Sequence, residues 1–103
     1  VGPAVHEVGV GQQGFELVGE EVLATGVEWT FAPTLAVARD TMVTTYESYS
    51  EDPEIVSAYA PEFIRGMQGD LGQDSIIACV KHFVGDGGTR HGVDQGDTVC
   101  AED

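Results

Sequence analysis

The chain has 103 residues, of which 42% are hydrophobic, and its 18 acidic and 4 basic residues give a formal net charge of −14. The apolar content argues against intrinsic disorder. The charge repels nucleic acid and anionic membranes, so we expect neither as a partner. No apolar run approaches the roughly 20 residues that cross a bilayer, and no export signal lies within the chain, which leaves the compartment open.

The first segments predict a loop and then a helix. Residues 1–13 sustain neither helical nor strand periodicity and are expected to be a loop or a frayed end. Over residues 14–25 the apolar residues repeat at helical spacing, and Gly26 follows as a natural C-terminal stop. This pattern predicts an amphipathic helix with an apolar face formed by Phe15, Val18 and Val22.

A strand and a long loop are expected next. Residues 27–32 alternate apolar and polar and are rich in β-branched and aromatic side chains, which predicts a strand closed by Pro33. Residues 34–51 show no clear period, and long loops are disproportionately functional. We therefore treat the loop over residues 34–51 as a candidate site.

A second helix is predicted to begin at Asp52-Pro53-Glu54. A capping Asp, a Pro in the first helical position and an acidic residue at the positive end of the helix dipole coincide there. Pro61 should kink this helix, and a run of glycines after it should end it. Its apolar stripe, with Met67 as a core residue rather than a cofactor ligand, consists of Ile55, Tyr59, Phe63 and Met67.

The last predicted element is a strand over residues 75–80. It is almost wholly apolar, as expected of a strand buried on both faces. The order helix, strand, loop, helix, strand implies parallel strands joined by helices, so the predicted fold class is α/β. Cys79 within it is expected to be a buried thiol, and a disulfide between Cys79 and Cys100 stays open.

Two ionisable side chains, Lys81 and His82, follow this strand directly. Ligands of parallel α/β folds gather at the carboxyl ends of strands. A Lys and a His there suit a hydroxyl-rich ligand, although a surface lysine beside a structural histidine explains the pair equally well. The glycine-rich residues 84–89 lack the pattern of a phosphate-binding loop, and their glycines are expected to allow tight turns close to a ligand.

Other site chemistries are disfavoured. The spacing of the nearby His and Asp residues matches no metal motif, and we expect no metal or cofactor. Helix capping accounts for Asp52 and Glu54, and we interpret Glu47 and Glu51 as solvated loop carboxylates. No serine or cysteine nucleophile motif occurs.

Three blocks of the sequence together resemble family 3 glycoside hydrolases. They are Ala-Thr-Gly-Val-Glu-Trp-Thr-Phe-Ala-Pro at 24–33, Tyr-Glu-Ser-Tyr-Ser-Glu-Asp-Pro-Glu at 46–54, and Lys-His-Phe-Val-Gly-Asp-Gly-Gly-Thr at 81–89. The resemblance covers residues 14–97 and leaves residues 1–13 largely unmatched.

The resemblance implies that residues 1–103 are an internal fragment of one catalytic domain, a partial (β/α) TIM-type barrel with about two strands and two main helices. It implies a retaining β-glucosidase or exo-β-glucanase that removes terminal non-reducing β-D-glucosyl residues, with β-glucosides as substrates and the rest of the parent chain as partner. Lys81 and His82 would bind sugar hydroxyls. Asp86 would shape the pocket, with a purely structural turn role equally open.

The resemblance also places the nucleophile and the acid/base carboxylate outside this chain, so the chain by itself is expected to be inactive. Members of this family are often periplasmic or secreted. A non-catalytic acidic sugar-binding module is the alternative function.

Two departures from the family pattern affect the sugar pocket. Between Arg39-Asp40 and Tyr46 the family has a longer run with a sugar-binding Arg, where this chain has only residues 41–45, Thr-Met-Val-Thr-Thr. Pro3 stands where the family has a sugar-binding Asp. The resemblance therefore implies a pocket that lacks two of the family's sugar contacts.

Overall fold

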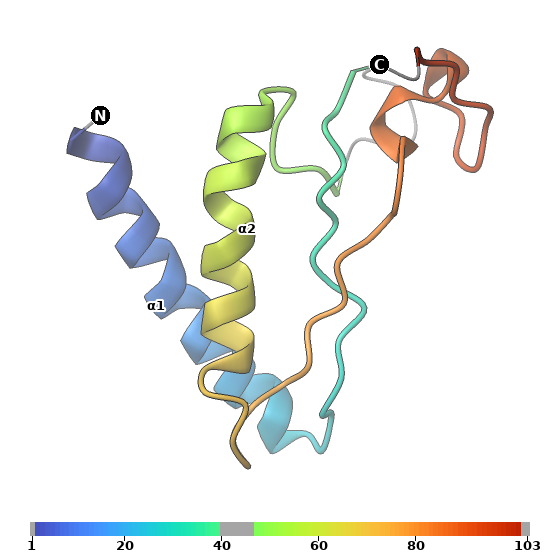
Figure 1. Cartoon of the computed structure of the whole chain (residues 1–103). Coiled ribbons are helices and arrows are strands. Elements are labelled where there is room, and N and C mark those ends of the chain that lie inside the picture. Colours follow the sequence, from blue (N-terminus) through green and yellow to red (C-terminus); the bar gives the residue numbers. More distant parts are fainter. Residues whose placement is uncertain (1, 40–46, 102–103) are drawn as a thin grey trace. The chain divides into compact units, whose positions relative to one another are not determined.

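The computed structural model describes residues 2–39 and 47–101 (Figure 1). It contains two α-helices, α1 (Gly2–Ala24) and α2 (Pro53–Gln68), and two short 3-10 helices, η1 (Asp86–Gly88) and η2 (Arg90–Gly92). The chain divides into two compact units. The first is formed by Val1–Pro33 and Ser57–Cys79, and the second by Thr34–Val56 and Val80–Asp103.

Helix α1 begins at Gly2, so the loop predicted for residues 1–13 is wrong. Each glycine in a helix interior lowers helix stability by up to about 1 kcal/mol relative to alanine. The glycines of this segment therefore make a helix difficult to predict from the sequence. A Cβ on Gly11 would lie 3.7 Å from the Tyr59 ring of α2, which is an ordinary contact distance, so packing there does not require glycine. The predicted end of the helix is confirmed by Gly26, which has a φ of 87°.

Helix α2 begins where the sequence predicts it. The Asp52 Oδ1 atom accepts a hydrogen bond of 2.9 Å from the Glu54 amide, which is the expected cap, and Pro53 is the first helical residue. Phe63 and Met67 are buried, which confirms Met67 as a core residue. Ile55 is 43% exposed, so the N-terminal end of the predicted stripe does not join the core.

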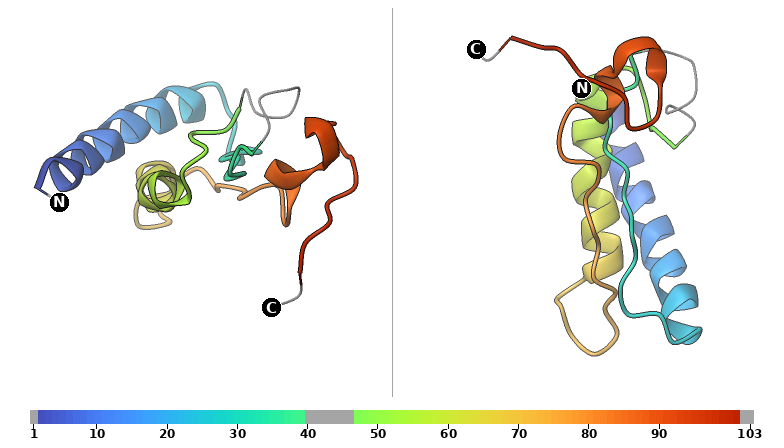
Figure 2. Two further views of the ribbon diagram at one scale, coloured as in Figure 1. Left: turned by 90° about the horizontal axis from the view of Figure 1, so that it is seen from above. Right: turned by 90° about the vertical axis from the view of Figure 1, so that its right-hand side faces the viewer.

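The two helices pack at a glycine in the first unit (Figure 2). A Cβ on Gly66 would lie 2.5 Å from the Cβ atom of Phe15 and 2.9 Å from the carbonyl oxygen of Gln12, so only glycine allows this approach. The rings of Phe15 and Phe63 lie 4.8 Å apart at 59°. Val18, predicted to share the apolar face with Phe15, is 46% exposed because the face that meets α2 passes through Gly19.

The predicted strand segments of the first unit pair in parallel at a single bridge between Trp29 and Ile77. The Thr30 amide donates to the carbonyl of Ile77, and the Ile77 amide donates to that of Glu28, each over 2.9 Å. Within residues 2–39 and 47–101 there is no strand longer than a single bridge residue. The parallel direction is the one that the predicted α/β class requires. A pair of extended segments without further neighbours is only marginally stable, which explains the short pairing.

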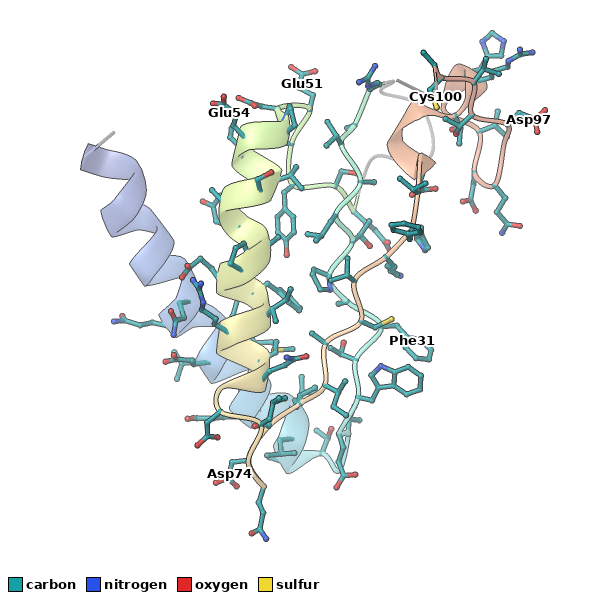
Figure 3. The ribbon with its side chains drawn as sticks, viewed as in Figure 1. Phe31, Glu51, Glu54, Asp74, Asp97 and Cys100 are labelled. Atoms are coloured by element: carbon teal, nitrogen blue, oxygen red, sulfur yellow. The ribbon has the colours of Figure 1, made fainter. Side chains whose placement is uncertain are left out.

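Only one face of these segments is covered. Ile76 is fully buried, and its amide donates to the carbonyl of Met67 in α2. Ile77 and Val80 are 55% and 51% exposed, so the expected burial of residues 75–80 on both faces is wrong. Trp29 and Phe31 form an exposed edge-to-face pair with ring centroids 5.0 Å apart (Figure 3).

The second unit has its own parallel bridge, between Thr34 and Lys81, and the Leu35 amide donates to the carbonyl of Lys81 over 2.8 Å. The Arg39 amide donates to the carbonyl of Gly87 over 3.1 Å. A Cβ on Gly87 would overlap the carbonyl oxygen of Val37. The glycine-rich loop is therefore held against the backbone of residues 37–39.

Part of the predicted loop over residues 34–51, including the five residues that replace the family's sugar-binding run, lies outside the described residues. Among the helices that are described, none has the length and apolar character needed to cross a membrane.

Candidate functional site

Lys81 and His82 lie where the paired segments of the second unit meet the glycine-rich loop. The bridge to Thr34 and the hydrogen bond from Leu35 fix the backbone of Lys81. The Lys81 side chain is 30% exposed and that of His82 is 53% exposed. The backbone at Lys81 is therefore fixed, while the side chains of Lys81 and His82 are accessible to solvent.

A polar pocket of about 460 Å³ lies at this point. Its volume falls within the roughly 300–1,000 Å³ that small-molecule sites usually have. All three residues singled out from the sequence line it. The complete lining consists of Thr34, Glu47, Lys81, His82, Asp86, Asp94 and Gln95.

The Lys81 ammonium faces a carboxylate in this pocket. Its Nζ atom lies 3.9 Å from Oε2 of Glu47, and the same oxygen accepts a hydrogen bond of 3.3 Å from the Thr34 hydroxyl. Glu47 is an exposed loop carboxylate, as predicted, with a side chain that is 44% exposed, but it also lines the pocket beside Lys81 and Thr34. Its position in the second family-like block, Tyr-Glu-Ser-Tyr, is the signal that could have identified it.

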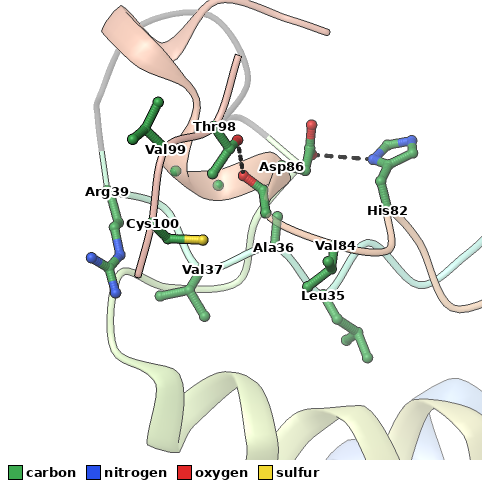
Figure 4. Close-up of a pocket in the computed structure, with 13 residues that line it drawn as sticks. Leu35, Ala36, Val37, Arg39, His82, Val84, Asp86, Thr98, Val99 and Cys100 are labelled. Atoms are coloured by element: carbon green, nitrogen blue, oxygen red, sulfur yellow. Dashed lines mark hydrogen bonds and ion pairs between the residues drawn. The ribbon is translucent and has the colours of Figure 1, made fainter. Parts of the chain in front are cut away.

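His82 is held by Asp86. The Nδ1 atom of His82 lies 3.1 Å from Oδ2 of Asp86, whose side chain is only 16% exposed (Figure 4). Asp86 also opens η1 and lines the pocket, so the two roles that the sequence left open do not exclude each other. Because Nδ1 is engaged, Nε2 is the ring nitrogen left for a ligand.

The glycine-rich loop is built as a tight turn. Gly85 has a φ of 93°, which favours glycine, and its carbonyl accepts a hydrogen bond of 2.8 Å from the Thr98 hydroxyl (Figure 4). The expectation of tight turns is therefore confirmed. The close approach at Gly87 is made to the backbone of Val37.

The other candidate groups are metal-binding side chains, the two cysteines and Tyr49. In the part of the chain that the structure describes, no three His, Cys, Asp or Glu side chains converge as a metal site. Cys79 is partly buried and Cys100 exposed, and both are free thiols. Burial raises the pKa of the Tyr49 phenol above its ordinary value of 10.0, so this side chain is a neutral group near pH 7.

Most of the chain matches one family of known proteins. Residues 6–102 match the Glycosyl hydrolase family 3 N terminal domain. The chain belongs to this glycoside hydrolase family. Solved family 3 structures resemble it closely. An exo-1,3/1,4-β-glucanase from a Pseudoalteromonas species shares 50% identity over 96% of this chain, with a TM-score of 0.84.

Two further relatives show the range of the family. A β-glucosidase from Listeria innocua, solved in complex with laminaribiose, shares 28% identity over 89% of this chain with a TM-score of 0.82. A β-hexosaminidase from Stenotrophomonas maltophilia (strain K279a) shares 34% identity over 69% of it. The chain spans 13% of the glucanase, 14% of the glucosidase and 20% of the hexosaminidase.

Proposed function

We propose that this chain is part of a longer retaining β-glucosidase or exo-β-glucanase, and that its polar pocket holds the terminal non-reducing glucosyl residue. Lys81, His82 and Asp86 are the sugar-binding residues in this proposal. The observation that carries it is that one pocket brings all three together in a family 3 glycoside hydrolase domain.

The mixture of donors and acceptors in the pocket supports a sugar ligand. Each sugar hydroxyl both donates and accepts hydrogen bonds, so its site needs both kinds of group. Lys81 offers only donors, Asp86 offers only acceptors, and Gln95 offers both. A neutral, hydroxyl-rich ligand suits this lining better than a phosphate, which the three carboxylates Glu47, Asp86 and Asp94 would repel.

We also propose that the two helices and the paired segments correspond to about two strands and two main helices of a (β/α) barrel. The parallel bridges and the close match to the glucanase support this arrangement. In such barrels the residues that bind substrate lie at the carboxyl ends of strands. Lys81 and His82 follow residues 75–80 in that position.

In the proposed reaction this chain positions the sugar, and the rest of the protein carries out the chemistry. A retaining glycosidase uses two carboxyl groups about 5–5.5 Å apart, one as nucleophile and one as acid/base. The proposal assigns both to residues outside this chain. The contribution of Lys81, His82 and Asp86 is to hold the hydroxyls so that the anomeric carbon faces the nucleophile, because misplacement by about 1 Å can cost about 100-fold in rate.

The substrate we propose is a β-glucoside. The exo-1,3/1,4-β-glucanase, which shares 50% identity with this chain, supports this choice, compared with 34% identity for the hexosaminidase. A comparison of aryl β-glucoside, β-xyloside and N-acetyl-β-glucosaminide hydrolysis by the complete protein tests this specificity. Preference for either of the last two substrates contradicts it.

The site assignment is tested by Lys81→Met in the complete protein that contains this chain. Met keeps the aliphatic stem of Lys81 and removes its hydrogen-bond donors. We expect kcat/KM for an aryl β-glucoside to fall about 100-fold, because the sugar is no longer oriented. Arg90→Met is the matched control, since Arg90 lies outside the pocket lining and the variant loses the same charge.

Unchanged kinetics in Lys81→Met would refute the site. If the wild-type protein binds glucose in a calorimetric titration but hydrolyses no glycoside, the alternative of a non-catalytic sugar-binding module holds. If it does neither, both proposals fail.

A further inference from the structure

We infer that Glu47 is a positioning residue that acts on the sugar through Lys81. The inference rests on the proposed function, in which Lys81 binds sugar hydroxyls. It concerns a residue outside the set of Lys81, His82 and Asp86.

Backbone contacts fix the main chain of Lys81 but do not determine the position of its ammonium group. The parallel bridge with Thr34 and the hydrogen bond from Leu35 hold the main chain of Lys81. The ammonium lies at the end of a flexible four-carbon stem, which can adopt many rotamers. A lysine that must meet one particular hydroxyl therefore needs a second contact at its tip.

Glu47 provides that contact, and Thr34 holds Glu47 in turn. The Thr34 hydroxyl donates to Oε2 of Glu47 over 3.3 Å, and Thr34 is only 8% exposed, so this donor sits on a well-packed residue. The same oxygen lies 3.9 Å from Nζ of Lys81. Thr34 is thus linked to Lys81 twice, through the backbone bridge and through the Glu47 carboxylate.

The distance between the two charges suits a positioning role. At 3.9 Å the pair attracts electrostatically but is longer than a hydrogen bond of about 2.7–3.2 Å. The Glu47 carboxylate therefore takes up none of the hydrogen-bond donors of the ammonium. A short charge-assisted hydrogen bond would instead have used one of them.

The pocket contains further carboxylates that compete with Glu47 for the Lys81 ammonium. Asp86 and Asp94 also line it, and either could draw the ammonium away from the sugar. Asp86 is paired with His82 over 3.1 Å. The hydroxyl of Thr34 places Glu47 on the side of the pocket where the backbone of Lys81 is anchored.

The expected effect is modest, because the pair is partly exposed. The Lys81 and Glu47 side chains are 30% and 44% exposed, and solvent weakens such pairs. Loss of the Glu47 charge should therefore lower kcat/KM about fivefold. Loss of Lys81 itself should cost far more, since it removes the contact with the sugar.

A double-mutant cycle in the complete protein tests the inference. Gln at position 47 keeps an oxygen that can accept from Thr34 but removes the charge. Glu47→Gln should lower kcat/KM for an aryl β-glucoside about fivefold in the wild-type background and leave it unchanged in a Lys81→Met background. An equal fall in both backgrounds, or no fall in either, would overturn the inference.

Two further variants serve as a matched control and as a substitute for Glu47→Gln. Glu51→Gln removes the same charge from the same loop outside the pocket lining and should leave kcat/KM unchanged. If Glu47→Gln does not fold, Thr34→Val removes the hydroxyl that holds Glu47 and should lower kcat/KM about twofold. This fall, too, should vanish when Lys81 is Met, and its persistence would contradict the inference.

A second measurement separates this inference from the proposed function. If the wild-type protein hydrolyses no β-glucoside, the proposed function fails, and acetylation of Lys81 followed by peptide mass spectrometry tests the pair directly. Glu47→Gln should raise the acetylation rate of Lys81 several-fold, and Glu51→Gln should leave it unchanged. Equal rates in the wild type and Glu47→Gln would overturn the pairing.

Discussion

His82 illustrates how the pocket orients a side chain that is half exposed. Its imidazole could rotate freely on the surface, but the Asp86 carboxylate holds Nδ1 at 3.1 Å. Asp86 is itself mostly buried at the start of η1, in a loop tied to Thr98 and to residues 37–39. The orientation of His82 therefore depends on the packing of the whole loop.

This dependence predicts the effect of removing the Asp86 carboxylate. Asp86→Ala should raise KM for an aryl β-glucoside about tenfold, because the imidazole loses the partner that orients it. Asp86→Asn keeps an acceptor for Nδ1 and should have a smaller effect. Asp97→Ala removes the same group outside the pocket lining and should leave KM unchanged. Steady-state kinetics of the complete protein measure these values, and equal effects of Ala and Asn would argue against an orienting role.

Lys81 is also exceptional in the charge distribution of the chain. It is the only lysine in the sequence, and the chain has a formal net charge of −14. A single lysine placed in a pocket that also contains Glu47, Asp86 and Asp94 is a local feature that the net charge does not reveal. Net charge argues against nucleic acid as a partner, whereas the pocket depends on where the few cations lie.

At the scale of elements, the contact between α1 and α2 explains the glycine at position 66 of α2. A Cβ on Gly66 would lie 2.5 Å from the Cβ atom of Phe15, whereas a Cβ on Gly19 of α1 would lie 3.4 Å from the Met67 sulfur, at the short end of ordinary contact. Glycines lower helix propensity but allow backbones to approach each other. In this pair the gain from packing outweighs the local cost.

Gly66→Ala and Gly14→Ala form a matched pair that tests this explanation. A Cβ on Gly66 would clash with Phe15 at 2.5 Å, so Gly66→Ala should destabilise the protein by about 1–3 kcal/mol. A Cβ on Gly14 meets nothing within 4 Å, so Gly14→Ala should stabilise α1 by about 0.5–1 kcal/mol. The thermal midpoints of the complete protein should shift in opposite directions. A stabilising Gly66→Ala would contradict the packing.

At the scale of the whole molecule, the exposed apolar side chains indicate surfaces that would normally be buried against other parts of a protein. Trp29, Phe31 and Ile77 of the first unit are 58%, 66% and 55% exposed. In the second unit Phe83 is 96% exposed and Val84 81%. Contiguous exposed apolar groups mark interaction surfaces or aggregation sites. In the proposed barrel, the neighbouring strands and helices of the parent chain would cover them.

This exposure predicts the behaviour of the isolated polypeptide. The 103-residue chain should bind a hydrophobic dye, unfold without a cooperative transition and show poorly dispersed amide signals, because its paired segments have open edges. It should also give no heat of binding with glucose. Sharp, dispersed amide spectra from a monomer would argue against this prediction.

What the sequence by itself determined depends on neighbours along the chain. The start of α2 at Asp52-Pro53, the stop at Gly26 and the family blocks were all readable in this way. So was the position of Lys81 and His82 after an apolar run, because capping, turn chemistry and motif spacing act over a few residues.

Only the tertiary structure decided the remaining features. The N-terminal half of α1 is helical although its periodicity is weak, and its contact with α2 lies far away in the sequence. Glu47 looked like one of many solvated carboxylates until the fold placed it beside Lys81 and Thr34. Both depend on contacts between segments that are distant in the chain, and local propensity carries no information about such contacts.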